Sequence, residues 1–332
     1  MRYYDITIAG RQVAGSGTVR FTSHPNGANS MPDPGALDID FDVQTFQLGS
    51  AGAPGSSYIN IRGVSLDYLS QAVQWGSISK NSSGALITFK GGMGKGLPLA
   101  KPAQSGVLLY GEIFQSYGNW SGLDQGLTLV PVAAQGYSSL VAGNFVFNMP
   151  KGTDLKTALT QTLTPLFPKN TIKIQFKNAI TFPYSIHHVC DNMDSFALWL
   201  ANQTTGYAGI VPAVSIYLVG NTIFIWDGLP YKNALTLDYS DLVGQPVWYG
   251  VETVLITTVL RADIQIGDTI KLPQNLANNA GFVTTNVEAY PSQVNYKTAF
   301  AGNFMVTSVR HLGSFKSFDG RQWISCFYCA AI

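Results

Sequence analysis

Residues 255–273 read LITTVLRADIQIGDTIKLP, and this stretch decides the fold class of the chain. Polar and apolar residues alternate along much of it, and the pair Gly267-Asp268 interrupts the pattern as a tight turn does. Residues 302–313 read GNFMVTSVRHLG and residues 322–328 read QWISCFY, with a similar excess of β-forming residues. We therefore expect strands from about residue 235 to the C-terminus.

The N-terminal part of the chain, to about residue 145, also predicts strands. Apolar residues recur there with a period of two between Gly, Pro and Asn residues. A short helix is expected at residues 65–75, because Leu66, Leu69 and Val73 are spaced like one apolar helix face. The expected strands cover residues 3–9, 37–46, 58–64, 86–89 and 107–114.

The middle of the chain changes character, because helices are expected there. Residues 153–167 place four Leu residues at spacings of four, four and three, which builds one apolar stripe, and Thr153 or Asp154 can cap its start. A second helix is expected at residues 192–202, with Asp191 as its cap. After it, the dipeptide Gly220-Asn221 between two apolar runs predicts a two-residue hairpin.

These patterns predict a mainly β protein with a small α+β domain. Three domains are expected, with β domains at residues 1–145 and 235–332 and an α+β connecting domain at residues 146–234. A chain of 332 residues is long enough for two or three domains of ordinary size.

Charge is sparse in this chain. Charged residues make up 12% of it and its formal net charge is +1, against about 25% charged residues in a typical soluble domain. No run of Lys and Arg occurs, which argues against strong general affinity for nucleic acid. A polar but nearly uncharged surface suits permanent contact with other subunits.

Targeting, membrane and disulfide signals are absent from the sequence pattern. The N-terminus alternates like a strand, and the apolar run at residues 254–260 is far shorter than the roughly 20 residues of a spanning helix. The cysteines Cys190, Cys326 and Cys329 form no disulfide framework. We expect synthesis and folding in a host cytoplasm, without membrane insertion.

The two C-terminal blocks resemble the second barrel of phage tail baseplate central hub proteins, a tail-tube-like double-barrel family related to the hub part of type VI secretion spikes. In that family this part tends to read strand, small turn, Gly-Asp, strand, Leu-Pro, followed by Phe-x-Val-x-x-Val-x-His. Here the first pattern lies in residues 255–273 and the second in residues 304–311. Residues 59–66 and 106–113 look like the family's first barrel, and residues 154–167 are similar to a helix of its linking domain.

The resemblance implies two tail-tube-like β-barrel domains joined by an α+β domain. It also implies a function as a structural hub that connects the tail tube to the central spike and lines the DNA channel as a homotrimeric, pseudo-sixfold ring. The implied partners are further copies of the chain, tube or tube-initiator proteins, the spike, other baseplate proteins and passing DNA that is not bound specifically. The implied location is the virion, in the tail baseplate. The family carries no catalytic set, so no catalytic residue, cofactor or metal is expected.

One strand carries the only candidate site residues. In residues 37–43, LDIDFDV, the side chains of Asp38, Asp40 and Asp42 project from one face and the apolar residues from the other. Two interpretations stay open: an ordinary half-buried strand with a solvated outer face, or an acidic face turned toward a channel, where like charge keeps DNA from sticking. A calcium loop is excluded, because Val43 stands where that loop needs Gly.

Other groupings of reactive residues point to structure rather than chemistry. Cys326 and Cys329 have C-x-x-C spacing but lie in an expected strand, so they face opposite sides. His187 and His188 are adjacent in extended chain, so their side chains point apart. Ligands of one metal ion converge instead, so we do not expect these two residues to form a metal site. Residues 91–96 contain Gly-Lys without the following Ser or Thr of a phosphate loop, and are expected to form a mobile or interface loop.

A second function stays open beside the hub. A β-rich tail component that binds a host receptor or glycan would use exposed aromatic residues as platforms. Trp120 and Trp75 are the candidates for that role.

Overall fold

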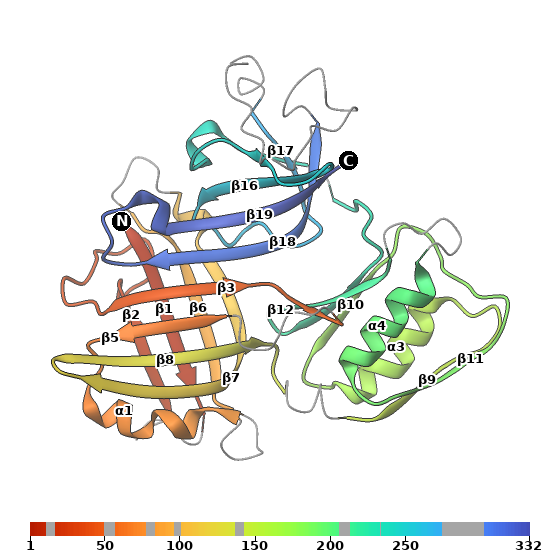
Figure 1. Cartoon of the computed structure of the whole chain (residues 1–332), viewed down its shortest axis with the longest axis horizontal. Helices are drawn as coiled ribbons and strands as arrows, with labels where there is room; N and C mark the ends of the chain where they lie inside the picture. The colour runs from red at the N-terminus through yellow and green to blue at the C-terminus, as the bar shows by residue number, and fades with distance from the viewer. Residues whose placement is uncertain are drawn as a thin grey trace.

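The computed structural model describes residues 1–10, 17–49, 57–77, 84–95, 101–136, 143–205, 213–232, 234–273 and 302–332. Within them, a mostly antiparallel sheet of 13 strands dominates and takes strands from both ends of the chain (Figure 1). A four-stranded sheet and a two-stranded sheet lie to one side with two helices. The prediction of a mainly β protein is confirmed.

The first β region is built from the N-terminal strands, which curl around one hydrophobic core. Alternation makes each strand two-faced: Ile59 and Ile61 are fully buried, while Tyr58 and Arg62 beside them are exposed. The strands are β1 (Arg2–Ala9), β2 (Thr18–Thr22), β3 (Asp38–Gln44), β5 (Tyr58–Arg62), β6 (Leu86–Met93), β7 (Gly106–Ser121) and β8 (Asp124–Ala133).

The helix at the end of this region is shorter than expected and buries a different face. Helix α1 spans Leu66–Ala72 and continues as a 3₁₀ turn at Val73–Trp75. Leu66 and Val73 are exposed, whereas Ala72 and Trp75 are fully buried. Of the predicted stripe, only Leu69 packs against the core. Val73 falls in the 3₁₀ turn, whose tighter winding moves it off the face that an α-helix would give it. Burial of Trp75 also removes it as a binding platform.

Part of the Gly-rich stretch expected to form a loop is strand instead. Gly91 and Gly92 belong to β6, where Gly92 is paired with Tyr3 of β1. The indole N–H of Trp323 donates to the carbonyl oxygen of Gly92 at 2.8 Å. A Cβ atom at Gly92 would lie 2.7 Å from Cα of Ser105, so close approach of two backbones explains this Gly. Residues 96 onward in that stretch lie outside the described residues.

The second β region comes from the C-terminal part of the chain and has its own core. It includes the last strand of the protein, and its core is rich in β-branched and aromatic side chains. Its strands are β14 (Leu235–Thr236), β15 (Val247–Trp248), β16 (Thr253–Val259), β17 (Thr269–Lys271), β18 (Asn303–Ser314) and β19 (Trp323–Ala331).

A β-bulge explains the spacing Phe-x-Val-x-x-Val-x-His in β18. Phe304, Val306, Val309 and His311 are all buried, although strict alternation would turn the second pair outward. The pairing of β18 with β19 shifts register between Val306 and Ser308, so one extra residue restores the inward direction.

The Gly-Asp pair closes the turn that precedes β17. Gly267 has φ of +80°, and a Cβ atom there would lie 2.7 Å from the ring of Tyr231. One carboxylate oxygen of Asp268 accepts the backbone N–H of Gln265 at 3.0 Å, and the other pairs with Lys232. The turn therefore holds the segment around residue 231 against the second β region.

The α+β region packs helices and short strands around a third core. The hairpin at Gly220-Asn221 is confirmed by the pairing of Val219 with Thr222. Its second helix begins one residue later than its predicted cap implied: Asn192, not Asp191, accepts the backbone N–H of Ser195 at 2.7 Å. The elements are β4 (Phe46–Leu48), β9 (Phe145–Met149), α3 (Leu155–Leu166), β10 (Thr171–Gln175), β11 (Ile186–Cys190), α4 (Met193–Thr204), β12 (Ser215–Val219) and β13 (Thr222–Trp226).

The pairing of β18 with β3 joins the two β regions into one sheet. Its register runs from Arg310 opposite Gln44 to Ser314 opposite Asp40. The main path of the large sheet then runs from β15 to β2, and no pairing among the described residues closes it into a barrel. The domain limits at 145 and 234 stay predictions. Single residues from one predicted domain enter the core of another. Leu48 lies in the core of the α+β region, and Trp323 lies in the core of the first β region.

Candidate functional site

The acidic strand is β3, and its alternation is strict. Ile39, Phe41 and Val43 are buried in the core of the first β region. The aspartate side chains point away from that core and are only partly exposed, at 21% for Asp38, 22% for Asp40 and 13% for Asp42. Exposure this low shows that neighbouring side chains cover much of each carboxylate.

The aspartates lie near the middle of a broad polar surface, which we call the front face. Strands β16, β19, β18, β3, β5, β8 and β7 lie side by side there, in front of β1, β2 and β6 (Figure 1). Cross-strand partners on the side opposite the cores define the surface. The front face comprises Thr253, Leu255, Thr257, Val259, Ala330, Tyr328, Cys326, Ile324, Ser308, Arg310, Leu312, Ser314, Gln44, Asp42, Asp40, Asp38, Tyr58, Asn60, Arg62, Gly126 and Thr128.

Two arginines of neighbouring strands bind the aspartates. Arg310 of β18 meets Asp42 with two hydrogen bonds, Nε to Oδ1 at 2.8 Å and Nη2 to Oδ2 at 2.5 Å. Arg62 of β5 contacts Asp40 through Nη2 and lies 3.5 Å from Asp38 through Nη1. The hydrogen bonds to Asp42 raise the pKa of Arg310, so they favour the charged form of its guanidinium.

The front face is therefore close to neutral. Its charges are three aspartates and two arginines, −3 and +2, which leaves −1. The remaining members are uncharged, with hydroxyl, amide, thiol or apolar side chains.

Sequence patterns identified the three aspartates but not the two arginines that bind them. Arg62 continues the alternation Tyr58, Asn60, Arg62, but its pairing with β3 depends on strand register.

A buried ion cluster joins the two β regions at another place. The guanidinium of Arg261, whose side chain is 3% exposed, lies 3.2 Å from Asp241 and 2.7 Å from Asp263. Lys101 reaches Asp241 at 2.9 Å and Asp238 at 2.5 Å. Burial raises the pKa of Asp241, but the hydrogen bond from Lys101, the backbone N–H of Asp238 and the charge of Arg261 outweigh burial and lower it. No sequence pattern marks this cluster.

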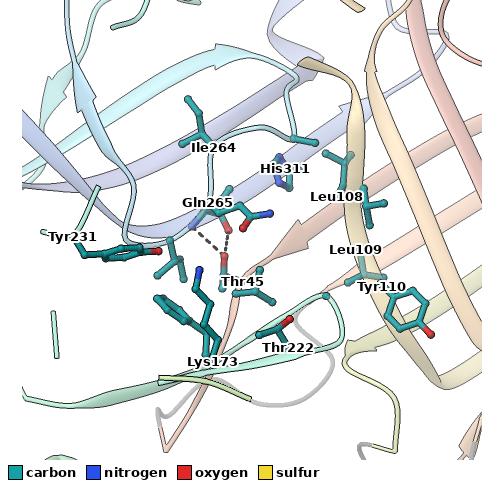
Figure 2. A pocket seen from close by; sticks show the side chains of 17 residues that line it. Thr45, Leu108, Leu109, Tyr110, Lys173, Thr222, Tyr231, Ile264, Gln265 and His311 are labelled. Carbon is teal, nitrogen blue, oxygen red and sulfur yellow. Dashed lines mark hydrogen bonds between the residues drawn. The ribbon is translucent and has the colours of Figure 1, made fainter. Parts of the chain in front are cut away.

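A pocket of about 260 Å³ opens where the three regions meet, and we call it the junction pocket (Figure 2). Its walls come from β7, the β12–β13 hairpin, Lys173 of β10, Tyr231, the segment 262–266, and β18. Lys173 is the one charged side chain in this lining, which lies entirely within the described residues. Burial lowers the pKa of His311 at the pocket wall to about 4, so its ring is neutral at pH 7.

The reactive residues considered from sequence lie apart from one another. Cys190, Cys326 and Cys329 are buried free thiols, and burial raises the pKa of Cys190 to about 11, so it is not a nucleophile at pH 7. His187 bonds Asn148, and the ring of His188 stacks on Trp199 at 4.2 Å. Across the part of the chain that the structure describes, no group of three or more His, Cys, Asp or Glu side chains is arranged to hold a metal ion.

No model of a known protein family matches the chain, and no curated protein matches it in sequence. Among the described residues, no helix is long and apolar enough to cross a membrane.

Solved structures of three tail proteins are similar to this chain over nearly its whole length. The tail protein from Neisseria meningitidis MC58 has a TM-score of 0.49 at 10% identity, and the match covers 99% of this chain and 96% of that one. The 43 kDa tail protein of prophage MuSo2 from Shewanella oneidensis has a TM-score of 0.47 at 8% identity, with coverage of 100% and 97%. Prophage tail protein gp18 from Listeria monocytogenes EGD-e has a TM-score of 0.38 at 7% identity, with coverage of 98% and 94%. No residue-by-residue correspondence follows at such low identity.

Proposed function

We propose that the protein is a structural, non-enzymatic component of a phage tail. In the finer form of this proposal it is the central hub of the baseplate, a homotrimeric ring that connects the tail tube to the spike and lines the DNA channel. The resemblance of the C-terminal blocks to that family motivates the proposal. The observation that carries it is the pairing of β18 with β3, which makes one uninterrupted sheet out of two β regions.

The front face suits the wall of a DNA channel. A basic wall would bind phosphates and retain DNA, because each neutralised phosphate releases counterions. The front face offers two arginines, Arg62 and Arg310, and both are already held by aspartates of β3. With its cations paired and its net charge at −1, this surface has no free positive group to hold a passing duplex.

The homotrimer is tested first by mass and shape in solution. We expect a particle of three times 35.8 kDa, with a central hole in negative-stain images. A spike protein is added if the chain alone is monomeric, because closure of the ring can depend on that partner. A compact monomer in both conditions would contradict the hub.

The orientation of the front face is tested by site-specific gold labelling of the ring. The natural cysteines are buried, so a maleimide label reports an introduced thiol. Tyr58→Cys places the label on the front face, and Lys90→Cys on β6 places it on an exposed position of the opposite layer. We expect the first label in the central hole and the second outside. Labels from Tyr58→Cys at the outer rim would contradict the channel assignment.

A second candidate function, receptor or glycan binding, has one observation in its favour. The β7–β8 hairpin carries Trp120 and Leu123 at its tip, with exposures of 65% and 102%. An exposed indole is a common stacking platform for sugars. Binding on a glycan array that is lost in Trp120→Ala and kept in Tyr239→Ala, a matched exposed aromatic residue elsewhere, would favour this function over the hub.

A further inference from the structure

We propose that the junction pocket binds a small monocarboxylate, with the carboxylate at Lys173 and an apolar body against Phe224, Ile264 and Val309. The pocket has about 260 Å³ of space, and a water molecule occupies about 30 Å³ in the liquid. It therefore has room for about eight waters or for one single-ring organic molecule. This site is independent of the hub function and of the front face.

The charge of the pocket selects an anion. Lys173 forms no ion pair with any carboxylate of the described residues. Asp268, the carboxylate of the nearby turn, is already bound by Lys232 and by the backbone N–H of Gln265. His311 is hydrogen-bonded to the hydroxyl of Ser325 at 2.8 Å and is neutral at pH 7. One unpaired cation therefore faces the ligand, which matches a single negative charge.

Two aromatic rings fix the position of that cation. The ammonium of Lys173 lies 5.2 Å from the ring centre of Phe224 and 5.5 Å from that of Tyr231. Figure 2 shows the side chain rising from β10 between Tyr231 and Thr222 toward Thr45. Cation–π attraction of this kind holds the amino group without neutralising its charge, so its N–H donors stay available for a carboxylate.

The rest of the lining disfavours more highly charged ligands. Val219, Ile264 and Val309 supply apolar wall, and Thr222 and Gln265 supply neutral polar groups. The lining offers no second cation to balance a second negative charge. A dicarboxylate or inorganic phosphate should therefore bind more weakly than a monocarboxylate with an apolar ring.

Calorimetric titration of the full chain at pH 7 tests the proposal, with benzoate as the probe and benzamide as its neutral isostere. We expect benzoate to bind at least tenfold more tightly than benzamide. Lys173→Met should raise the dissociation constant for benzoate at least tenfold and leave that for benzamide unchanged. Lys177→Met, an exposed lysine just beyond β10, is the matched control and should change neither.

Two further measurements keep the test decisive. Lys173→Gln repeats the loss of charge with a polar side chain if the Met variant folds poorly, and Thr222→Phe should abolish binding of both probes by filling the pocket. The proposal is overturned if benzoate gives no binding at millimolar concentration, if it binds Lys173→Met as well as the natural chain, or if inorganic phosphate binds more tightly than benzoate.

Discussion

Arg310 and Asp42 form a two-pronged ion pair between β18 and β3, so that residues 268 positions apart share two hydrogen bonds in the middle of the large sheet. The pair lies where the first and second β regions meet. The guanidinium fork matches the carboxylate geometrically, which a lysine at this position would not do.

The first prediction concerns the free energy of unfolding associated with this pair. In a double-mutant cycle with Arg310→Met and Asp42→Asn, we expect a coupling of about 0.5–1 kcal/mol, because Arg310 remains partly exposed. Urea denaturation of the four proteins measures it. The longer Arg62–Asp38 contact, at 3.5 Å, serves as the comparison and should couple more weakly. Equal coupling energies in both cycles would mean that the two-pronged geometry of the Arg310–Asp42 pair does not strengthen it.

The second prediction concerns charge on the front face. Replacing Asp38, Asp40 and Asp42 by Lys changes the net charge of this face from −1 to +5, since three new cations join two arginines that lose their partners. We expect this variant to bind a short DNA duplex with strong salt dependence, unlike the natural chain. Fluorescence anisotropy with a labelled duplex at low and moderate salt measures it.

The triple Asn variant is the control for that experiment. It removes the same ion pairs without adding cations, so it should fold and show no affinity for DNA. If the Lys variant is soluble and ignores DNA, the front face is not accessible to a duplex. Loss of soluble protein in the Lys variant alone would indicate that the ion pairs act mainly on stability.

The third prediction concerns the buried ion cluster. Arg261→Met removes the guanidinium partner of the buried Asp241, which keeps its contact with Lys101. Leaving a buried charge without any partner typically costs roughly 3–5 kcal/mol, so we expect a loss below that range. Folding lowers the pKa of Asp241, so the folded state binds that proton less readily than the unfolded state. The stabilisation is therefore present above the ordinary pKa of 3.8 and is lost as pH falls below it. Thermal melts at decreasing pH should show this loss in the natural chain and less of it in Asp241→Asn.

The fourth prediction concerns the stability of the protein between pH 4 and 6.5, a window above the one in which Asp241 acts. Burial lowers the pKa of His311 from 6.5 to about 4, so the unfolded chain takes up this proton first. The contribution of the neutral His311 to the free energy of unfolding is fully present above pH 6.5. It is lost as pH falls from 6.5 to 4, by about 3 kcal/mol in all. His311→Gln should flatten the melting temperature over this window. Burial also lowers the pKa of His24, so a smaller residual slope belongs to that residue. An unchanged slope in His311→Gln would contradict the assignment.

The fifth prediction concerns the Gly-Asp turn. Gly267→Ala introduces a methyl group 2.7 Å from the ring of Tyr231 at a φ of +80°. Gly244→Ala is the matched control, since its φ is +83° and no atom lies within 4 Å of the added methyl group. We expect a loss of about 1 kcal/mol in the control from the backbone alone, and about 2–3 kcal/mol in Gly267→Ala. Denaturation of both variants measures it, and equal losses would mean that Tyr231 moves aside freely.

Local patterns in the sequence were sufficient for much of the fold. The alternation in β3, the Leu stripe of α3 and the dipeptide Gly220-Asn221 each report a structure formed within about fifteen residues. Within the stripe, Leu155, Leu159 and Leu163 are buried and Leu166 is exposed. The bulge in β18 is also visible in the spacing of Val306 and Val309, although only the register with β19 reveals it as a bulge.

Long-range geometry was beyond the reach of such patterns. The partners of Asp42 and Asp241 come from distant segments, and nothing in either neighbourhood signals them. The face that α1 buries depends on a 3₁₀ turn that ends at Trp75, which helical spacing did not anticipate. The junction pocket is a property of three regions meeting and has no signature in any one of them.

Strand β3 continues through Thr45 into β4, the edge strand of the four-stranded sheet. A mechanical load applied to the α+β region would thus be delivered along the axis of β3. Its backbone hydrogen bonds to β5 and β18 lie across that axis and would be sheared together rather than unzipped one at a time. Rupture of β3 from its neighbours under tension would then require many of these bonds to break at once.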